Sequence, residues 1–388
     1  MSLRNLWLIF AQSATVALGV LFVVATLRPE WLPLGSPTVV AFREAPRAPD
    51  QGAIPPAGSA TSYSAAARRA LPSVVYVFTS RELKSPRPFS DDPVFRQFFG
   101  DALEGAPRRA TSLGSGVIVS PSGYVLTNNH VVEGMDEIDV ALSDGKNFTA
   151  RIVGTDPETD LAVLKLDAEG LPAITLGNAE LVQVGDVVLA IGNPFGVGQT
   201  VTMGIVSALG RSGLGITTYE NLIQTDAAIN RGNSGGALVN ASGELIGVNT
   251  AILSPSGGSL GIGFAVPVST ARGVMEQIIA TGSVTRGFIG VEARELTSDL
   301  VESMKLASPD GVQIAGLVPD GPADRAGAKV GDVLLAIEGK PITNAHTMLE
   351  TVAKLHPGDT VKMRLRRGAR ELDVRLTVGT RPKPVHSQ

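Results

Sequence analysis

The sequence predicts a mainly β protein with two folded units that follow an apolar N-terminal segment. From about residue 62 onward, short runs rich in Val, Ile and Leu alternate with Gly, Asn, Asp and Pro. The 388 residues include 44 Gly and 25 Pro, and only 5% are aromatic. Helical periodicity is confined to a few short stretches. Regularly spaced strands without intervening helices are typical of antiparallel sandwiches or barrels.

The N-terminal segment predicts a transmembrane anchor over residues 6–27. Its 22 residues, Leu6 to Leu27, carry no charge, and Arg4 and Arg28 flank them. About 20 apolar residues are enough to cross the hydrocarbon core. A cleavable signal peptide is the alternative, but its apolar region would be about 7–15 residues long and would end in a small-residue cleavage site. No A-x-A pattern follows closely. The basic flank favours a cytoplasmic N-terminus, with the bulk of the chain outside.

The chain after this segment divides by composition. Residues 28–61 are rich in Pro, Ala and Gly without a period, which indicates a linker. The first folded unit spans 62–282 and should end in a helix that Ser269 caps and Gly282 terminates. Within it, residues 81–113 interrupt the strand rhythm with a long, polar, Pro-containing stretch that includes four Phe. A loop of this length is usually functional or disordered.

The second folded unit spans 283–380. Five strand-like runs occupy it, with two short helices expected near Ala323–Ala326 and Ala345–Leu355. It is therefore a compact domain of a size that can fold around its own core.

Composition excludes several classes of function. The formal net charge of −4 and the pI near 5.7 give no electrostatic basis for binding nucleic acid. The chain has no cysteine, which rules out disulfides and thiolate metal sites. No phosphate-binding loop motif is present. We therefore expect no metal and no cofactor.

One glycine-rich stretch suggests chemistry. Arg231–Leu238, RGNSGGAL, places Ser234 among three glycines and an asparagine. Taken alone, this composition favours a turn. The alternative is a nucleophile on a loop whose amides surround a developing oxyanion, where any Cβ would obstruct. The choice depends on whether the rest of the chain supplies a base and an acid.

The base is predicted by elimination. A nucleophilic serine needs a neighbouring base, most often histidine. The chain has four histidines, and three of them, His346, His356 and His386, lie in the second unit or its tail. His130, in TNNHVV at the end of a strand, is the one in the same unit as Ser234. A structural imidazole is the alternative for a single histidine in a β protein.

The acid is predicted from its setting. Asp160, in TDLAVLKL, lies at the edge of a strongly apolar strand, where a partly buried carboxylate needs a partner. A catalytic histidine in turn needs an acceptor that fixes its tautomer. Asp226, in QTDAAIN, is the second candidate, but it lies only eight residues before Ser234 and is expected to brace the loop.

The order His130, Asp160, Ser234 matches the chymotrypsin-like order of the catalytic triad. We therefore predict a double β-barrel, with the base and the acid on the first barrel and the nucleophile on the second. The loop Gly232-Asn233-Ser234 would form the oxyanion hole, chiefly through the N–H groups of Gly232 and Ser234.

The stretches TNNHVV, TDLAVLKL and GNSGGALVN, followed by RGFIGV, resemble the HtrA/Deg family of serine proteases with a C-terminal PDZ domain. The resemblance runs from about Ser62 to Thr380, and one anchor with one PDZ domain is similar to the DegS-like arrangement. It implies an ATP-independent endopeptidase at the bacterial inner membrane that faces the periplasm, with unfolded or regulatory proteins as substrates. It also implies a homotrimer with SYSAAARRALPSVV in its contacts, and a mobile loop at 81–113. A chaperone-like binding protein with minor proteolysis is the alternative.

The resemblance also assigns a substrate pocket. The residue six positions before the nucleophile, Ala228, would lie at the base of this pocket, and Ile229 follows it. Neither is a carboxylate, so cleavage after Lys or Arg is disfavoured, and Val, Ala or Ile should fit.

Regulation is assigned by the same resemblance. RGFIGV resembles the family's carboxylate-binding loop, in which amides around Phe288, Ile289 and Gly290 would receive a peptide C-terminus. Met348 would line the groove, although packing in the core is the alternative for these apolar residues. Arg211, in ALGRSG, matches the position of the family's sensor-loop arginine.

Overall fold

The computed structural model describes residues 62–82, 109–193, 198–252, 258–306 and 308–382, together with positions 7, 12, 15, 16, 43 and 44. The chain divides into two compact units, Met1–Val40 and Ala41–Gln388, and the second holds the elements discussed here. Nearly all of the predicted anchor at 6–27 lies outside the described residues. Among those that are described, no helix combines the length and apolar character needed to cross a membrane.

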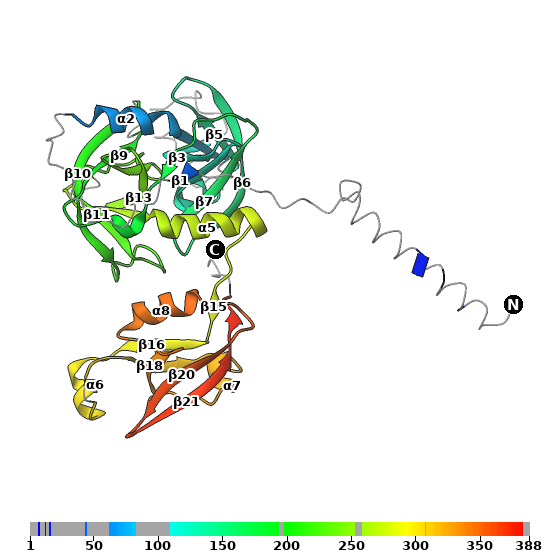
Figure 1. Ribbon diagram of the computed structural model, residues 1–388, viewed down its shortest axis with the longest axis vertical. Coiled ribbons are helices and arrows are strands. Elements are labelled where there is room, and N and C mark those ends of the chain that lie inside the picture. Colours follow the sequence, from blue (N-terminus) through cyan, green and yellow to red (C-terminus); the bar gives the residue numbers. More distant parts are fainter. Residues whose placement is uncertain are drawn as a thin grey trace, which may run out of the picture. The chain divides into compact units, whose positions relative to one another are not determined.

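The first part of the large unit is a closed β-barrel (Figure 1). Its strands are β2 (Val74–Glu82), β3 (Arg109–Ser120), β4 (Tyr124–Thr127), β5 (Glu137–Ala141), β6 (Asn147–Asp156) and β7 (Leu161–Leu166), paired in the order β2-β3-β4-β7-β6-β5. Alternate residues of a strand face the same side, and here the inward set is apolar. It includes Val75, Val77, Ile118, Val125 and Leu164.

The predicted interruption at 81–113 is shorter than expected. Pairing of β2 with β3 continues without a break from Val74↔Val117 to Glu82↔Arg109. The polar and charged residues at both ends of the stretch therefore belong to strands β2 and β3. The sequence did not predict this because apolar and polar residues do not alternate there. The four Phe of this stretch lie outside the described residues.

Six further strands close a second barrel: β9 (Val187–Gly192), β10 (Thr200–Arg211), β11 (Leu222–Thr225), β12 (Ala237–Asn240), β13 (Leu245–Ile252) and β14 (Gly263–Pro267). The order is β12-β9-β10-β11-β14, and β13 pairs with both β12 and β14. A short strand, β8 (Thr175–Leu176), pairs in parallel with β13 and with β1 (Arg43–Glu44). The latter lies within the segment 28–61 that we predicted as a linker.

The helices described in the two-barrel part are α2 (Ser64–Ala70), the 3₁₀ turns η2 (Leu71–Ser73) and η4 (Ala179–Leu181), α4 (Asn129–Val132) and α5 (Val268–Thr281). Gly282 ends α5 as predicted, in the left-handed region at φ 79°, with its amide donating to the Ile278 carbonyl. The predicted cap was wrong. The helix begins one residue before Ser269, because β14 runs directly into Pro267, which takes the N-cap position.

The C-terminal part is a separate sheet with helices. Its strands are β16 (Val291–Glu295), β17 (Val312–Leu317), β18 (Val333–Ile337), β20 (Thr360–Arg367) and β21 (Arg370–Thr377), in that order; β19 (Lys340–Pro341) pairs with β18, and β15 (Gly287–Phe288) pairs with β22 (Gly379–Thr380). Its helices are α6 (Ser298–Ser303), α7 (Pro322–Arg325) and α8 (Ala345–Ala353). The long hairpin β20–β21 is drawn in red in Figure 1. Among the described residues, β16 and β21 are the two edge strands of this sheet.

Candidate active site

His130 and Asp160 lie together at one end of the first barrel. His130 stands on the short helix α4, which begins two residues after β4 ends. Asp160 ends the turn that precedes β7. The imidazole Nδ1 is 2.7 Å from Asp160 Oδ2, and the His130 amide donates to Oδ1 at 2.9 Å. The side chain of His130 is 48% exposed and that of Asp160 13% exposed. The Nδ1 edge of the imidazole is thus bound to Asp160, while about half of the side chain remains accessible to solvent.

Asp160 is fixed through its backbone as well. Its φ of +57° lies in the left-handed region, which Asp adopts more readily than most residues. The Asp160 carbonyl accepts hydrogen bonds from the side-chain amide of Asn128 at 2.8 Å and from the backbone amide of Asn129 at 3.1 Å. The two asparagines beside the histidine therefore clamp the turn that carries the acid.

A third contact to the carboxylate was not foreseen from the sequence. The hydroxyl of Thr250, on β13 of the second barrel, donates to Asp160 Oδ2 at 2.7 Å. Thr250 is 4% exposed. Because this residue comes from the second barrel, the acid of one barrel is hydrogen-bonded to the other.

Ser234 follows a tight turn. The Asn233 amide donates to the Asn230 carbonyl at 3.0 Å, and Gly232 has φ +97°. A turn with positive φ at its third residue favours glycine there. Within the described part of the chain, the amides of Gly232 and Ser234 have no hydrogen-bond acceptor. They are thus available to an oxyanion.

The hydroxyl of Ser234 donates to the Thr250 carbonyl at 3.3 Å. No hydrogen bond links Ser234 to His130 among the described residues. Catalytic hydrogen bonds are often long or poorly aligned before substrate binds, so this geometry is compatible with a serine that turns toward the imidazole in the complex.

A cleft of about 200 Å³ opens beside this serine. It is lined by Ile229, Asn230, Arg231, Ser234, Thr250, Ala251 and Ile252. Of the two predicted pocket residues, Ile229 lines the cleft and Ala228 does not. The Ala228 carbonyl instead accepts the hydroxyl of Thr202 at 2.8 Å.

Two other candidate residues have local partners. Asp226 accepts the amide of Ile205 at 2.7 Å, so this carboxylate braces β10, whereas we expected it to brace the nucleophile loop. Arg211, at the end of β10, donates from Nε to Gln224 Oε1 at 2.8 Å. Within the described residues, Arg211 therefore contacts its own barrel.

The predicted peptide-binding residues form two groups: two have side chains buried in the core, and the other two would act through their backbone. Ile289 and Met348 are each 3% exposed and belong to the hydrophobic core of the C-terminal part. Gly290 has φ +75°, and its carbonyl accepts the Val318 amide at 2.9 Å. Phe288 is half-buried. The Met348 side chain thus packs inside, because its helix position faces the sheet.

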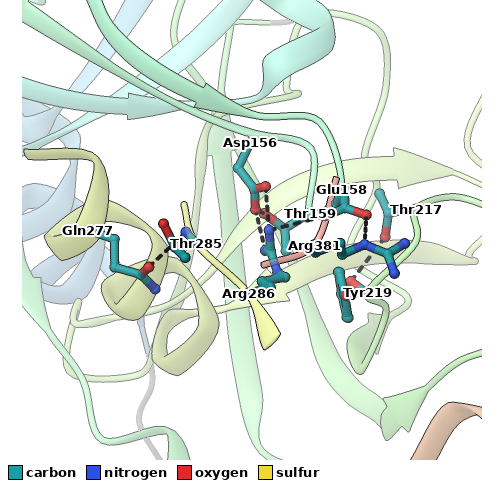
Figure 2. Close-up of polar contacts among 9 residues, drawn as sticks. All are labelled: Asp156, Glu158, Thr159, Thr217, Tyr219, Gln277, Thr285, Arg286 and Arg381. Atoms are coloured by element: carbon teal, nitrogen blue, oxygen red, sulfur yellow. Dashed lines mark hydrogen bonds and ion pairs between the residues drawn. The ribbon is translucent and has the colours of Figure 1, made fainter. Parts of the chain in front are cut away.

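Sequence reasoning also missed a buried ionic cluster that joins the C-terminal part to the first barrel (Figure 2). Arg286 makes a two-pronged ion pair with Asp156, at 2.7 and 2.5 Å. Arg381 donates to Glu158 at 2.7 Å, and both guanidinium groups lie against the ring of Tyr219, at 4.5 and 5.5 Å from its centre.

The cluster keeps its charges despite burial. Desolvation alone would lower the pKa of Arg286, but the hydrogen bonds and negative charge of Asp156 outweigh it and raise that pKa. Burial raises the pKa of the Tyr219 hydroxyl. Asp156 and Glu158 stand on the same turn as Asp160, so the turn that carries the acid is anchored on both sides.

In the described part of the chain, no cluster of three or more His, Cys, Asp or Glu could hold a metal ion.

Comparison with known proteins agrees with this arrangement. Residues 114–248 match the trypsin-like peptidase domain family, and residues 287–378 match the PDZ domain family. The chain is 43% identical over 315 residues to the periplasmic pH-dependent serine endoprotease DegQ of Escherichia coli K12, covering 80% of this chain and 69% of that protein. The chain belongs to the HtrA/Deg family of serine proteases.

Other HtrA/Deg members are also similar to this chain. A probable periplasmic serine endoprotease, DegP-like, of Ectopseudomonas mendocina is 43% identical over 341 residues, covering 84% of this chain and 72% of that protein. The solved structure of the HtrA-type protease AlgW with decapeptide is 52% identical, with a TM-score of 0.74, covering 83% of this chain and all of that one. The prediction of a mainly β, chymotrypsin-like protease domain followed by a PDZ domain is confirmed, and the HtrA/Deg chain is a serine endopeptidase.

Proposed function

We propose that this HtrA/Deg chain cleaves peptide bonds with Ser234 as nucleophile, His130 as general base and Asp160 as the group that orients it. The observation that carries the assignment is the 2.7 Å contact of the imidazole with Asp160. Because Nδ1 is engaged, Nε2 is the nitrogen that takes the proton of the serine hydroxyl and later gives it to the leaving amine. The carboxylate stabilises the imidazolium that forms in between.

The amides of Gly232 and Ser234 stabilise the tetrahedral oxyanion. They are oriented before the reaction by the turn at Asn230–Asn233, and fixed donors of this kind need no reorganisation as charge develops. Asn233 contributes as the residue between them, through the amide that closes the turn.

The cleft beside Ser234 favours small apolar residues before the cleaved bond. Ile229 and Ile252 line it, and no carboxylate does. A volume of about 200 Å³ suits Val, Ala or Ile. Ala228 does not line the cleft and would contribute only through the position of its backbone, whose carbonyl accepts the Thr202 hydroxyl.

The chain acts on unfolded or regulatory proteins in the periplasm without ATP. The relatives named above are periplasmic endoproteases. The apolar segment 6–27 would hold the enzyme in the inner membrane with both domains facing the periplasm, and three chains would form a homotrimer. Residence in the membrane fraction after a carbonate wash tests the anchor, and release by the wash would contradict it.

C-terminal peptides regulate this activity through the PDZ domain. Support comes from the solved structure of AlgW with a decapeptide, and from the edge strand β16, which has one side unpaired among the described residues and contacts α8. An extended peptide can add there as a strand, with its carboxylate at the amides of Phe288, Ile289 and Gly290. Arg211 would transmit the signal to the protease domain.

The test is cleavage of an unfolded reporter protein by the wild type and by Ser234→Ala, with the new termini sequenced. The proposal expects cleavage after Val, Ala or Ile by the wild type and none by the variant. The alternative, a chaperone-like binding protein with minor proteolysis, predicts that both proteins bind the reporter and leave it intact.

A further inference from the structure

The loop that carries Ser234 is hydrogen-bonded to a single serine of the first barrel. Ser115, on β3, is fully buried. Its amide donates to the Ser234 carbonyl at 2.8 Å, and its hydroxyl lies 2.6 Å from the Gly232 carbonyl. Two peptide groups of the loop, one on each side of Asn233, are therefore fixed from outside the second barrel.

The direction of the hydroxyl contact is determined by its second partner. The amide of Asn193, at the end of β9, points at the Ser115 hydroxyl from 2.9 Å. An N–H can only donate, and a serine hydroxyl has one proton to give. That proton must therefore go to the Gly232 carbonyl.

Ser115 is itself held firmly. Its carbonyl accepts the hydroxyl of Thr127 at 2.7 Å, and both residues are fully buried. Gly235 packs so closely that an added Cβ would come within 2.1 Å of the same carbonyl. A side chain with this many fixed partners is a rigid support.

Gly232 needs such a support. Glycine adopts positive and negative φ about equally well, so the residue alone does not hold the value of +97° that this turn requires. Two hydrogen bonds restrain the turn: the one from the Asn233 amide to the Asn230 carbonyl, and the one from the Ser115 hydroxyl to the Gly232 carbonyl.

We propose that Ser115 is a positioning residue for the oxyanion hole. Its hydroxyl holds the carbonyl of the peptide group between Gly232 and Asn233. This restrains the backbone of Gly232, whose amide, on the preceding peptide group, is then kept directed at the reacting carbonyl. This inference rests on the proposed role of Ser234 and extends it to a residue that contacts neither substrate nor the triad side chains.

The test compares Ser115→Ala with Ser120→Ala in the full-length protein. Ser120 is the matched control because it is a buried serine of the same strand, 1% exposed, whose hydroxyl bonds Ser122 and not the nucleophile loop. The measurements are kcat and KM on a peptide substrate, the inhibition constant of a peptide boronic acid, and binding of the cleaved product peptide. The boronate adduct is tetrahedral and fills the oxyanion hole, whereas the product peptide uses the substrate pocket alone.

Removing an oxyanion donor outright costs about 10²–10³ in kcat, so loss of its support in Ser115→Ala should cost about 10- to 100-fold. Boronate inhibition should weaken by a similar factor, while KM and product binding stay near the wild-type values. Ser120→Ala should match the wild type in every measurement.

A kcat for Ser115→Ala equal to that of Ser120→Ala would overturn the inference. Equal weakening of boronate and product binding would overturn it too, because it would mean a general loss of structure. If Ser115→Ala does not fold, Ser115→Cys repeats the test, since a thiol is a weak donor of similar shape; wild-type kcat in that variant would count against the inference. A wild type that shows no boronate-sensitive cleavage would sink the proposed function itself, whereas an active wild type with an unimpaired Ser115→Ala would sink only the positioning role.

Discussion

At the scale of single residues, Asp160 carries the largest expected effect. Both of its carboxylate oxygens are engaged, Oδ1 by the His130 amide and Oδ2 by the imidazole and the Thr250 hydroxyl. In Asp160→Asn, an amide nitrogen would face Nδ1 or Thr250, and the histidine would take the wrong tautomer. Turnover should fall by about 10⁴.

The measurement is kcat on a peptide substrate together with the thermal unfolding midpoint. The unfolding midpoint should change far less than kcat, because the substitution keeps the shape of the side chain. Asp226→Asn is the control, since Asp226 braces β10 away from the imidazole. Near-normal turnover in Asp160→Asn with loss in Asp226→Asn would move the acid to Asp226.

At the catalytic site, the sequence predicted the base and the acid but missed the two hydroxyl groups that hold them and the nucleophile loop in place, and elsewhere it missed the ion pair of Arg286 with Asp156. His130 was found by elimination, and Asp160 by its position beside an apolar strand; the structure brings the two within 2.7 Å. Thr250 and Ser115 each lie in an ordinary strand and become neighbours of the site only when the two barrels pack together. No local pattern in the sequence predicts how the two barrels pack. Met348 was expected at a groove, with packing in the core as the alternative, and the structure places its side chain in the core.

At the scale of elements, the turn from Asp156 to Asp160 connects the ionic cluster with the acid. Arg286 and Asp156 have side chains that are 9% and 5% exposed. Removing one partner of a buried ion pair leaves the other charge without compensation, at a cost of about 3–5 kcal/mol. Arg286→Ala should therefore lower the free energy of unfolding of the protease domain by about that amount.

Urea unfolding of the full-length protein measures this effect. The matched control is Lys146→Ala, which breaks a pair with Asp144 whose side chains are 69% and 50% exposed. Exposed pairs contribute little to stability, so the control should unfold like the wild type. Equal unfolding midpoints for Arg286→Ala and Lys146→Ala would show that the cluster adds no stability.

The existence and type of elements with regularly spaced apolar residues were predicted well, whereas the residues at which these elements begin and end were predicted less well. The helix stop at Gly282 and the start of α8 at Ala345 follow from local chemistry. The extension of β2 and β3 into polar sequence follows from their pairing with each other, which a single strand does not reveal.

At the scale of the whole molecule, peptide control should depend on a free carboxylate. An activating peptide must bind the active state more tightly than the resting state. A coupling of about 1–3 kcal/mol would give roughly 5- to 150-fold stimulation. Amidation of the peptide C-terminus removes the charge that the amides at residues 288–290 would bind, and stimulation should be lost.

The measurement is cleavage of an unfolded reporter with the free-acid and amidated forms of one peptide, side by side. A chain ending at Gly282 should respond to neither form. Equal stimulation of the full-length protein by both forms would refute the sensing of C-termini. Arg211→Ala should reduce stimulation more than it reduces peptide binding.

The proposed mechanism depends most on Ser234 as a nucleophile activated by His130. A fluorophosphonate that labels active-site serines, followed by peptide mapping of the labelled protein, tests this most directly. We expect one phosphonylated residue, Ser234, in the wild type, and loss of labelling in both Ser234→Ala and His130→Ala while the folded state is retained. Labelling at another residue, or undiminished labelling of Ser234 in His130→Ala, would contradict the proposed mechanism.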